Sequence, residues 1–177
     1  MSSFGEDGRS IDSVNSIHDY TRRTVSREEL EDIEHFKPLL NWWRQETQAK
    51  QHLPSRKDFN PAEFPAILPH IAIFEPIFKD GELTDCRTVL IGTELTKVYG
   101  EATGELASQI NNEYVVQTVL SSVGECIRTL QPVGIKSKAV SKELPFLRSY
   151  ALYCPLATDH SHIDKILVHV AFDKVES

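Results

Sequence analysis

The chain has 177 residues, of which 40% are hydrophobic and 25% are charged, and its formal net charge at pH 7 is -7. This length allows one domain with a hydrophobic core plus an appended segment, and both fractions are ordinary for a soluble globular protein. The acidic balance argues against nucleic acid or an anionic membrane as a partner, because phosphate binding requires a basic surface, although one local basic groove stays compatible with it.

The cysteines and the apolar segments indicate the compartment. Cys86, Cys126 and Cys154 are widely spaced among apolar residues and form no C-x-x-C pair, so we expect three reduced, small hydrophobic side chains. No window approaches the roughly 20 apolar residues of a membrane span, and no apolar run opens the chain. The sequence therefore predicts a cytoplasmic protein without membrane insertion.

The N-terminal part divides into a tail and a helix. Residues 1–25 are rich in Ser, Gly, Asp and Arg, which predicts a mobile tail. Ser26 and Glu29 fit the capping-box pattern at a helix start. The helix expected over residues 26–51 has apolar residues three to four positions apart, with a kink or a restart at Pro38.

The apolar stripe of this helix has two interpretations, between which the sequence does not decide. Trp42 and Trp43 pack either on the helix's own domain or across the seam of a homodimer. The candidate interface residues of that homodimer are Ile33, Phe36, Leu40, Trp42 and Trp43.

Residues 52–177 are expected to form the main domain. Residues 53–69 contain four prolines, which indicates extended segments and short turns. Residues 70–78 and 83–91 follow as two strands, joined as a hairpin through a turn that contains Asp80-Gly81.

The second half of the domain alternates helices with strands. A short helix is expected after Gly92, capped by Thr93 and ended by Gly100, and the longest helix is expected over residues 113–131, after a cap at Asn112. Three strands complete the chain, over residues 133–140, 146–156 and 162–173. Both faces of the last strand are apolar, so one face should meet the core and the other a helix or a partner.

Three linked motifs carry a resemblance to a known family. They are LPSRKDFNP, ILPHIAIFEP and CRTVLIGTELTKVYGEATG, within residues 53–104. Together they resemble a bacterial family of single PAS-like domains, with the patterns L-P-x-R-x-D-F-x-P and R-x-x-x-x-G-T-x-x-x-x-x-Y-G-x-x-T-G. The residues that match the last pattern are Arg87, Gly92, Thr93, Tyr99, Gly100, Thr103 and Gly104. The rest of the chain is similar only in the order of its elements, five strands in two blocks with helices between them.

The resemblance implies a fold and a general role. The expected fold is α+β and PAS-like, a five-stranded antiparallel sheet flanked by helices with an N-terminal extension helix. The expected function is a sensory or protein-interaction module in signal transduction, not an enzyme. It would bind a small molecule or a regulatory protein partner and signal by altered association, as a homodimer or with that partner. The resemblance identifies no cofactor, because such a family is defined by its fold.

The expected ligand site combines an apolar lining with two polar candidates. Arg87 either braces the turn at Gly92 or points into the cavity, and Tyr99 either bonds to a ligand or is an ordinary core tyrosine. The candidate ligand-binding residues are Ile73, Arg87, Tyr99, Val116, Leu120, Ile135, Leu152, Ile166 and Val168.

Other functions stay open. An enzyme on a cystatin-like fold would need an acid and a base facing one cavity, such as Asp58 with His70 or His169. A ligand-free structural adaptor would dock partners on the N-terminal helix and the open sheet face. His160 and His162 could meet around a metal, but they lie in an expected turn, where polar residues are ordinary, so neither a metal site nor a catalytic residue is predicted.

Overall fold

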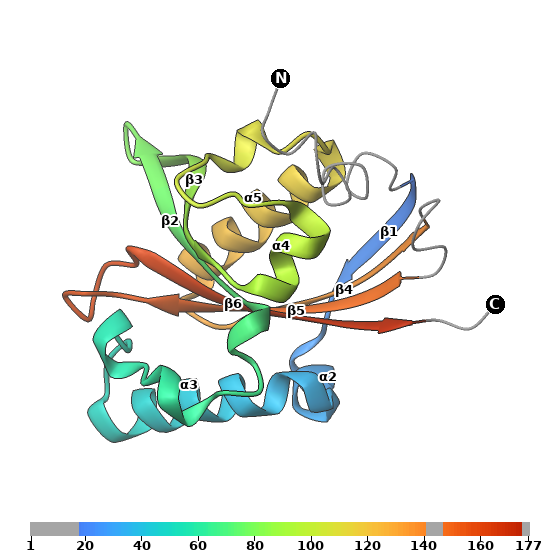
Figure 1. Ribbon diagram of the computed structural model, residues 1–177. Helices are drawn as coiled ribbons and strands as arrows, with labels where there is room; N and C mark the ends of the chain where they lie inside the picture. Colours follow the sequence, from blue (N-terminus) through green and yellow to red (C-terminus); the bar gives the residue numbers. More distant parts are fainter. Residues whose placement is uncertain (1–17, 141–146, 175–177) are drawn as a thin grey trace.

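A computed structural model of the protein describes residues 18–140 and 147–174 (Figure 1). Its centre is one antiparallel sheet with the strand order β1-β4-β5-β6-β2-β3. The strands are β1 (His18–Thr24), β2 (Ile71–Lys79), β3 (Glu82–Ile91), β4 (Val133–Val140), β5 (Leu147–Leu156) and β6 (Lys165–Lys174).

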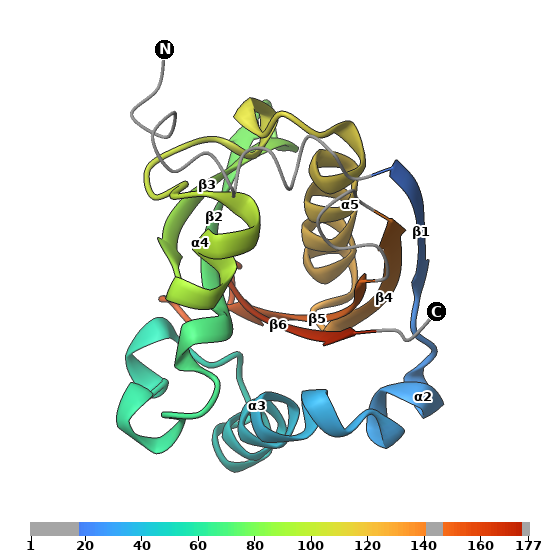
Figure 2. The same cartoon turned by 45° about the vertical axis from the view of Figure 1, so that its right-hand side comes forward.

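A layer of helices covers each face of the sheet (Figures 1 and 2). One layer is formed by α4 (Thr93–Tyr99) and α5 (Glu113–Thr129), and the other by α2 (Arg27–Asp32) and α3 (Lys37–Lys50). The remaining helical turns are the short 3-10 helices η2 (Glu34–Phe36), η3 (Arg56–Asp58), η4 (Pro61–Glu63), η5 (Leu68–His70) and η6 (Ala107–Gln109).

The α+β class and the antiparallel sheet are confirmed, but the predicted number of strands is wrong, since the sheet has six strands and not five. The additional strand is β1, at the sheet edge beside β4, in the segment predicted as a tail. Its sequence HDYTRRT lacks the alternation of apolar residues by which strands are recognised. Backbone pairing with β4 holds this strand in place, and such pairing cannot be recognised from the local amino-acid sequence. Residues 1–17 of the predicted tail lie outside the described residues.

The β2–β3 hairpin is confirmed, and its turn follows from local chemistry. Asp80 and Gly81 have φ angles of 54° and 80°. A tight hairpin turn of this kind requires positive φ at both central residues, which Asp-Gly tolerates better than other pairs.

The sheet separates two hydrophobic cores because side chains alternate along each strand. Ile166 and Val168 on β6 lie in the first core, on the side of α4 and α5, whereas Leu167 between them lies in the second core, on the side of α3. The prediction that both faces of this strand are covered is confirmed. Residues of the first core include Ala72, Phe74, Cys86, Leu95, Val119, Val123, Ile166 and Val168, and those of the second include Phe36, Leu39, Leu40, Trp43, Ile71, Leu152 and Leu167.

The N-terminal helix of the prediction is broken into α2, η2 and α3. The capping box of Ser26 and Glu29 starts α2, and Pro38 lies in the first turn of α3, so the restart predicted there is confirmed. Proline is tolerated at that place because a first-turn amide has no partner within the helix.

The stripe of α3 packs on the sheet of its own chain. Trp43 is 4% exposed and its Nε1 donates to the Pro155 carbonyl at 2.8 Å. Phe36, Leu40 and Trp42 are buried beside it, and Ile33 is half-buried against the same core. A homodimer stays a prediction, but these five side chains are not the exposed surface on which the sequence placed its seam.

Gly92 permits the closest approach of two segments at the end of β3. Its amide donates to the Ile71 carbonyl at 2.7 Å, and a Cβ on it would lie 2.3 Å from the Pro69 carbonyl oxygen. Gly92 is also the N-cap residue of α4, so Thr93 is the first helical residue and not the predicted cap. The approach fixes the start of α4 against η5, and α4 forms one wall of the site described next.

Candidate functional site

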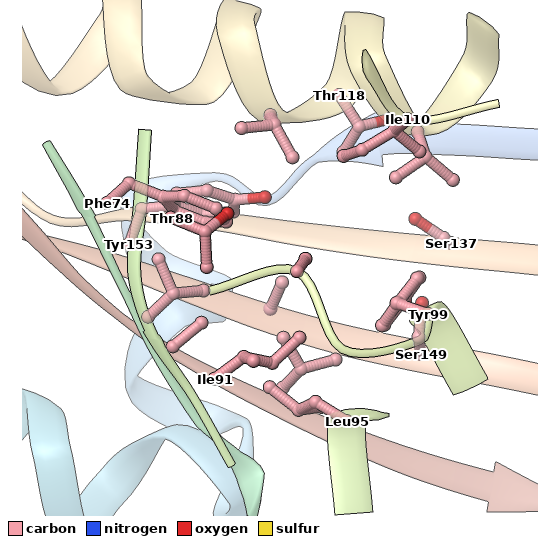
Figure 3. A pocket seen from close by; sticks show the side chains of 17 residues that line it. Phe74, Thr88, Ile91, Leu95, Tyr99, Ile110, Thr118, Ser137, Ser149 and Tyr153 are labelled. Carbon is pink, nitrogen blue, oxygen red and sulfur yellow. The ribbon is translucent and has the colours of Figure 1, made fainter. Parts of the chain in front are cut away.

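A cavity of about 80 Å³ lies inside the first core, between the sheet and the helices α4 and α5 (Figure 3). Figure 3 shows Thr118 and Ile110 on the α5 side of the cavity, and Ser137 and Ser149 on the side of the sheet. Most of the wall is apolar. Six lining residues carry a hydroxyl group: Thr88, Tyr99, Thr118, Ser137, Ser149 and Tyr153.

Small residues create the space. Ala72 on β2 and Ala151 on β5 both line the cavity where their strands carry bulkier neighbours. Two α4 residues, Leu95 and Tyr99, close it from the other side. A core packed at ordinary density has few voids larger than one water molecule, so a cavity of this size requires an explanation.

An arginine lies next to one hydroxyl of the lining. Arg22 on β1 donates to Thr118 Oγ1 at 2.6 Å, and Thr118 in turn donates to the Tyr114 carbonyl at 2.7 Å. The edge strand β1 therefore also places the Arg22 cation beside the cavity lining. The sequence prediction missed Arg22 because β1 was taken as a tail, and it missed Thr118 because only apolar residues of the long helix were considered.

The size of the cavity limits what it can hold. Pockets for drug-sized ligands have about 300–1,000 Å³, and an engineered cavity of about 150 Å³ binds benzene. At about 80 Å³ this cavity accepts a molecule of a few non-hydrogen atoms. A larger ligand would have to extend through the opening of the cavity or displace part of its wall, such as α4.

The predicted ligand-binding residues are only partly brought together. Tyr99 and Val168 line the cavity. Ile135 and Ile166 are buried in the same core without lining it, and Leu120 packs against this core. Val116 is half-buried on α5 and is not a lining residue.

Ile73 and Leu152 lie in the second core, on the opposite face of the sheet. The lining positions are their chain neighbours Ala72, Ala151 and Tyr153. Because side chains alternate, a choice that is off by one residue moves the whole set to the other face. Small residues within the strands were the signal that could have identified the cavity face.

Arg87 does neither of the two things predicted for it. Its side chain is exposed and donates to the Gly104 carbonyl at 2.8 Å, so it braces the turn at Gly104, not the one at Gly92, and does not enter the cavity. The physical reason is again alternation, since the next residue, Thr88, is the one that faces inward. Backbone bonds between Thr88 and Glu105 and between Gly104 and Thr88 hold the same segment on β3.

The acid–base pairs of the enzyme hypothesis are not formed. Asp58 accepts from the Ser55 amide at 2.8 Å and from Lys50 Nζ at 2.9 Å. The Ser55 amide bond is the main cause that lowers the pKa of Asp58 to about 2. The arrangement is a local lock of η3.

His169 and His70 lie together on the other side of the sheet, with ring centroids 6.4 Å apart. His169 is 4% exposed, and burial lowers its pKa to about 4, with a smaller contribution from the charge of His70. Within the described ranges, Nδ1 of either ring has no hydrogen-bond partner. Both imidazoles therefore belong to the second core and not to the cavity.

The two histidines considered for a metal diverge. The ring centroids of His160 and His52 lie 3.8 Å apart with the rings tilted by 35°, and Nδ1 of His160 lies 3.0 Å from the Leu53 carbonyl oxygen. His162 instead forms a hydrogen bond with Asp159. In residues 18–140 and 147–174, no three His, Cys, Asp or Glu side chains form a group able to hold a metal ion. The cysteines are free and buried, and burial raises the pKa of Cys86 to about 12.

Two further findings concern the whole chain. Among the helices of the described segments, none is both long and apolar enough to traverse a lipid bilayer. A comparison with protein-family models finds no match to this chain, and a comparison with the curated proteins finds no similar sequence.

Proposed function

We propose that the chain is a PAS-like, cytoplasmic sensory module that binds a small, mainly apolar molecule in the cavity between the sheet and α4 and α5. The observation that carries the proposal is the cavity, which is lined by residues of the first core, where ordinary packing leaves few voids larger than a water molecule.

The order of the elements supports the PAS-like part of the proposal. Two strand blocks, β2–β3 and β4–β5–β6, enclose α4 and α5 in the sequence, in the order by which the chain resembles that family. Pairing of β6 with β2 joins the blocks into one sheet, to which β1 is an addition at the edge.

The lining supports binding as the activity. Its apolar groups favour an apolar ligand, and its hydroxyl groups can orient that ligand by hydrogen bonds. A very efficient small ligand gains at most about 1.5 kcal/mol per non-hydrogen atom. A ligand of about five such atoms would therefore bind with a dissociation constant no lower than the micromolar range.

A bound ligand would signal by changing the relative populations of two arrangements of helix and sheet. It can do so only if it binds one arrangement more tightly than the other. The short helix α4 is the element that a larger ligand would displace, because Leu95 and Tyr99 form its wall of the cavity. The output would be an altered affinity for a regulatory partner or a second copy of the chain.

The test fills the cavity. Ala151→Leu adds three carbon atoms to a lining position, and Ala49→Leu adds the same atoms to an exposed position of α3 as the matched control. Native mass spectrometry would detect a retained small molecule. Ligand-observed NMR would then test 1-butanol, isobutanol and cyclopentane, small enough for the cavity, as probes.

We expect the unmodified protein and Ala49→Leu to bind at least one probe, or to retain a ligand, and Ala151→Leu to lose at least tenfold in affinity. Equal binding by Ala151→Leu would place the ligand elsewhere. Absence of any binding to the unmodified protein would contradict the sensory role and favour the adaptor.

A further inference from the structure

Five cations from three neighbouring strands border an open depression of about 260 Å³. They are Arg22 and Arg23 on β1, Lys136 and Lys138 on β4, and Arg148 on β5. The chain has 26 acidic against 19 basic residues, so a gathering of basic side chains departs from its overall charge.

Strand register places four of these cations on one face. Arg23 is paired with Lys136, and Lys138 with Arg148. Directly paired residues have Cβ atoms about 4.5–5.5 Å apart and point to the same side. This is the side of α2, since a Cβ on Gly134, two residues before Lys136, would meet Leu30. Figure 1 shows the ends of β4, β5 and β6 extending beyond α2.

Both register pairs bring like charges together, which costs free energy in a sheet. The first pair is partly neutralised, because Glu29 accepts from Arg23 at 2.6 and 2.8 Å and Lys136 lies over the Tyr150 ring. The Arg23 side chain is 53% exposed and that of Glu29 39%, so solvent screens their ion pair and this compensation is modest.

The second pair is compensated by one carboxylate at most among the described residues. In the described part of the chain, no carboxylate forms an ion pair with Lys138 or Arg148. The acid nearest in register is Asp173, and its carboxylate contacts His35 at 3.2 Å. Two adjacent, accessible cations thus face the depression, and Asp173, the carboxylate beside Arg148 within the described strands, contacts His35.

Protection of the sheet edge does not explain this arrangement. Charged residues on an edge strand discourage pairing with other chains, and Arg23 on β1 serves that purpose. Lys138 and Arg148, however, lie on β4 and β5, which are interior strands of the sheet. Their charges point away from the sheet and cannot block its edge.

We propose that this depression binds a small molecule with two or more linked phosphate groups, of the class of nucleoside di- and triphosphates. Linked phosphates concentrate several negative charges within a few ångströms, which matches the spacing of the two register pairs. Arg148 can bind a phosphate with two parallel hydrogen bonds, and the lysines add point charges. The net charge of -7 opposes a long nucleic acid, whose many phosphates would extend beyond the depression.

The test measures binding of tripolyphosphate to the full chain by calorimetry, at low and at moderate salt. Lys138→Gln with Arg148→Gln removes two charges from the depression. Lys57→Gln with Lys79→Gln removes two exposed charges elsewhere and is the matched control. We expect one tripolyphosphate per chain, at least tenfold weaker binding for the first double variant and less than a twofold change for the control.

A second readout separates loss of binding from loss of fold. Without ligand, the Lys138→Gln and Arg148→Gln variant should melt at the same or a higher temperature, because a like-charge pair is gone. Tripolyphosphate should raise the melting temperature of the unmodified protein but not that of this variant. If the double variant does not fold, the single variant Lys138→Gln is measured in its place, because Lys138 is exposed.

Competition arms identify the ligand class. ADP and ATP should displace tripolyphosphate, whereas inorganic phosphate should do so only weakly. The proposal is overturned if tripolyphosphate does not bind or if both double variants bind it equally. Tighter binding of a glutamate-rich peptide or of single-stranded RNA would also overturn it, in favour of a macromolecular partner.

Discussion

The buried imidazole of His169 makes this residue a source of pH-dependent stability. Its pKa is lowered from 6.5 to about 4, by burial first and then by the charges of His70 and His35. Between these two values the unfolded chain binds a proton that the folded chain does not, so stability falls as the pH falls through this window and is full above it.

We predict that His169→Leu abolishes this part of the pH dependence. The unmodified protein should lose about 2.5 kcal/mol of unfolding free energy between about pH 7.5 and 4.5 from this group alone, at 1.36 kcal/mol for each unit of pKa difference. Urea unfolding at both pH values measures the loss. His162→Gln is the control, since its side chain is 90% exposed and it should leave the difference unchanged. A His169→Leu protein with the full pH dependence would refute the assignment.

At the scale of the element, we expect two glycines to respond oppositely to substitution by alanine. A Cβ on Gly92 would lie 2.3 Å from the Pro69 carbonyl oxygen, and backbone atoms cannot yield as a flexible side chain can. A Cβ on Gly124, inside α5, would meet only Leu83 Cδ2 at 3.8 Å, an ordinary contact.

Gly92→Ala should therefore lower the unfolding free energy by about 3 kcal/mol or more, because the start of α4 must move from η5. Gly124→Ala should raise it by up to about 1 kcal/mol, since alanine is the better helix former. Chemical denaturation of both variants gives the comparison. Effects of the same sign would show that the contact at Gly92 does not position α4.

Elements with a local cause were predictable from the sequence. The caps Ser26 and Asn112 accept the hydrogen bonds expected of them, and the Asp80-Gly81 turn closes its hairpin. The side of the sheet to which each strand residue points was harder to predict, because register depends on partner strands far along the chain. A β-bulge between Ile73 and Phe74 shifts the pairing of β2 with β3, and no sequence pattern near it predicts the shift.

The candidate site escaped sequence reasoning for a related reason. The sequence prediction chose large apolar residues as the cavity lining. Two of them, Ile135 and Ile166, fill the core beside the cavity, whereas the small residues Ala72 and Ala151 leave the space that forms the cavity. Tyr99 was found because it belongs to the motif that carried the resemblance. The basic depression could not be found, since its cations come from β1, β4 and β5 and converge only through pairing.

At the scale of the whole molecule, the helical layer of α2 and α3 is an integral part of the fold. Leu40 is 1% exposed and packs in the second core, under the sheet that also carries the cavity on its other side. Removing α3 would expose the apolar residues of that face, so oligomeric state must be measured on the full chain with single substitutions.

Leu40→Ala distinguishes a core residue from a dimer contact. We predict a loss of about 2–5 kcal/mol in unfolding free energy, from lost burial and the space left behind, with no change in oligomeric state. Gln45→Ala, at an exposed position of the same helix, should change stability by no more than about 0.5 kcal/mol. Denaturation and sedimentation velocity over a range of protein concentrations measure the two quantities. A Leu40→Ala variant that keeps its stability but changes from dimer to monomer would show that this stripe lies in a dimer interface. That outcome would favour the interpretation in which Trp42 and Trp43 pack across a homodimer.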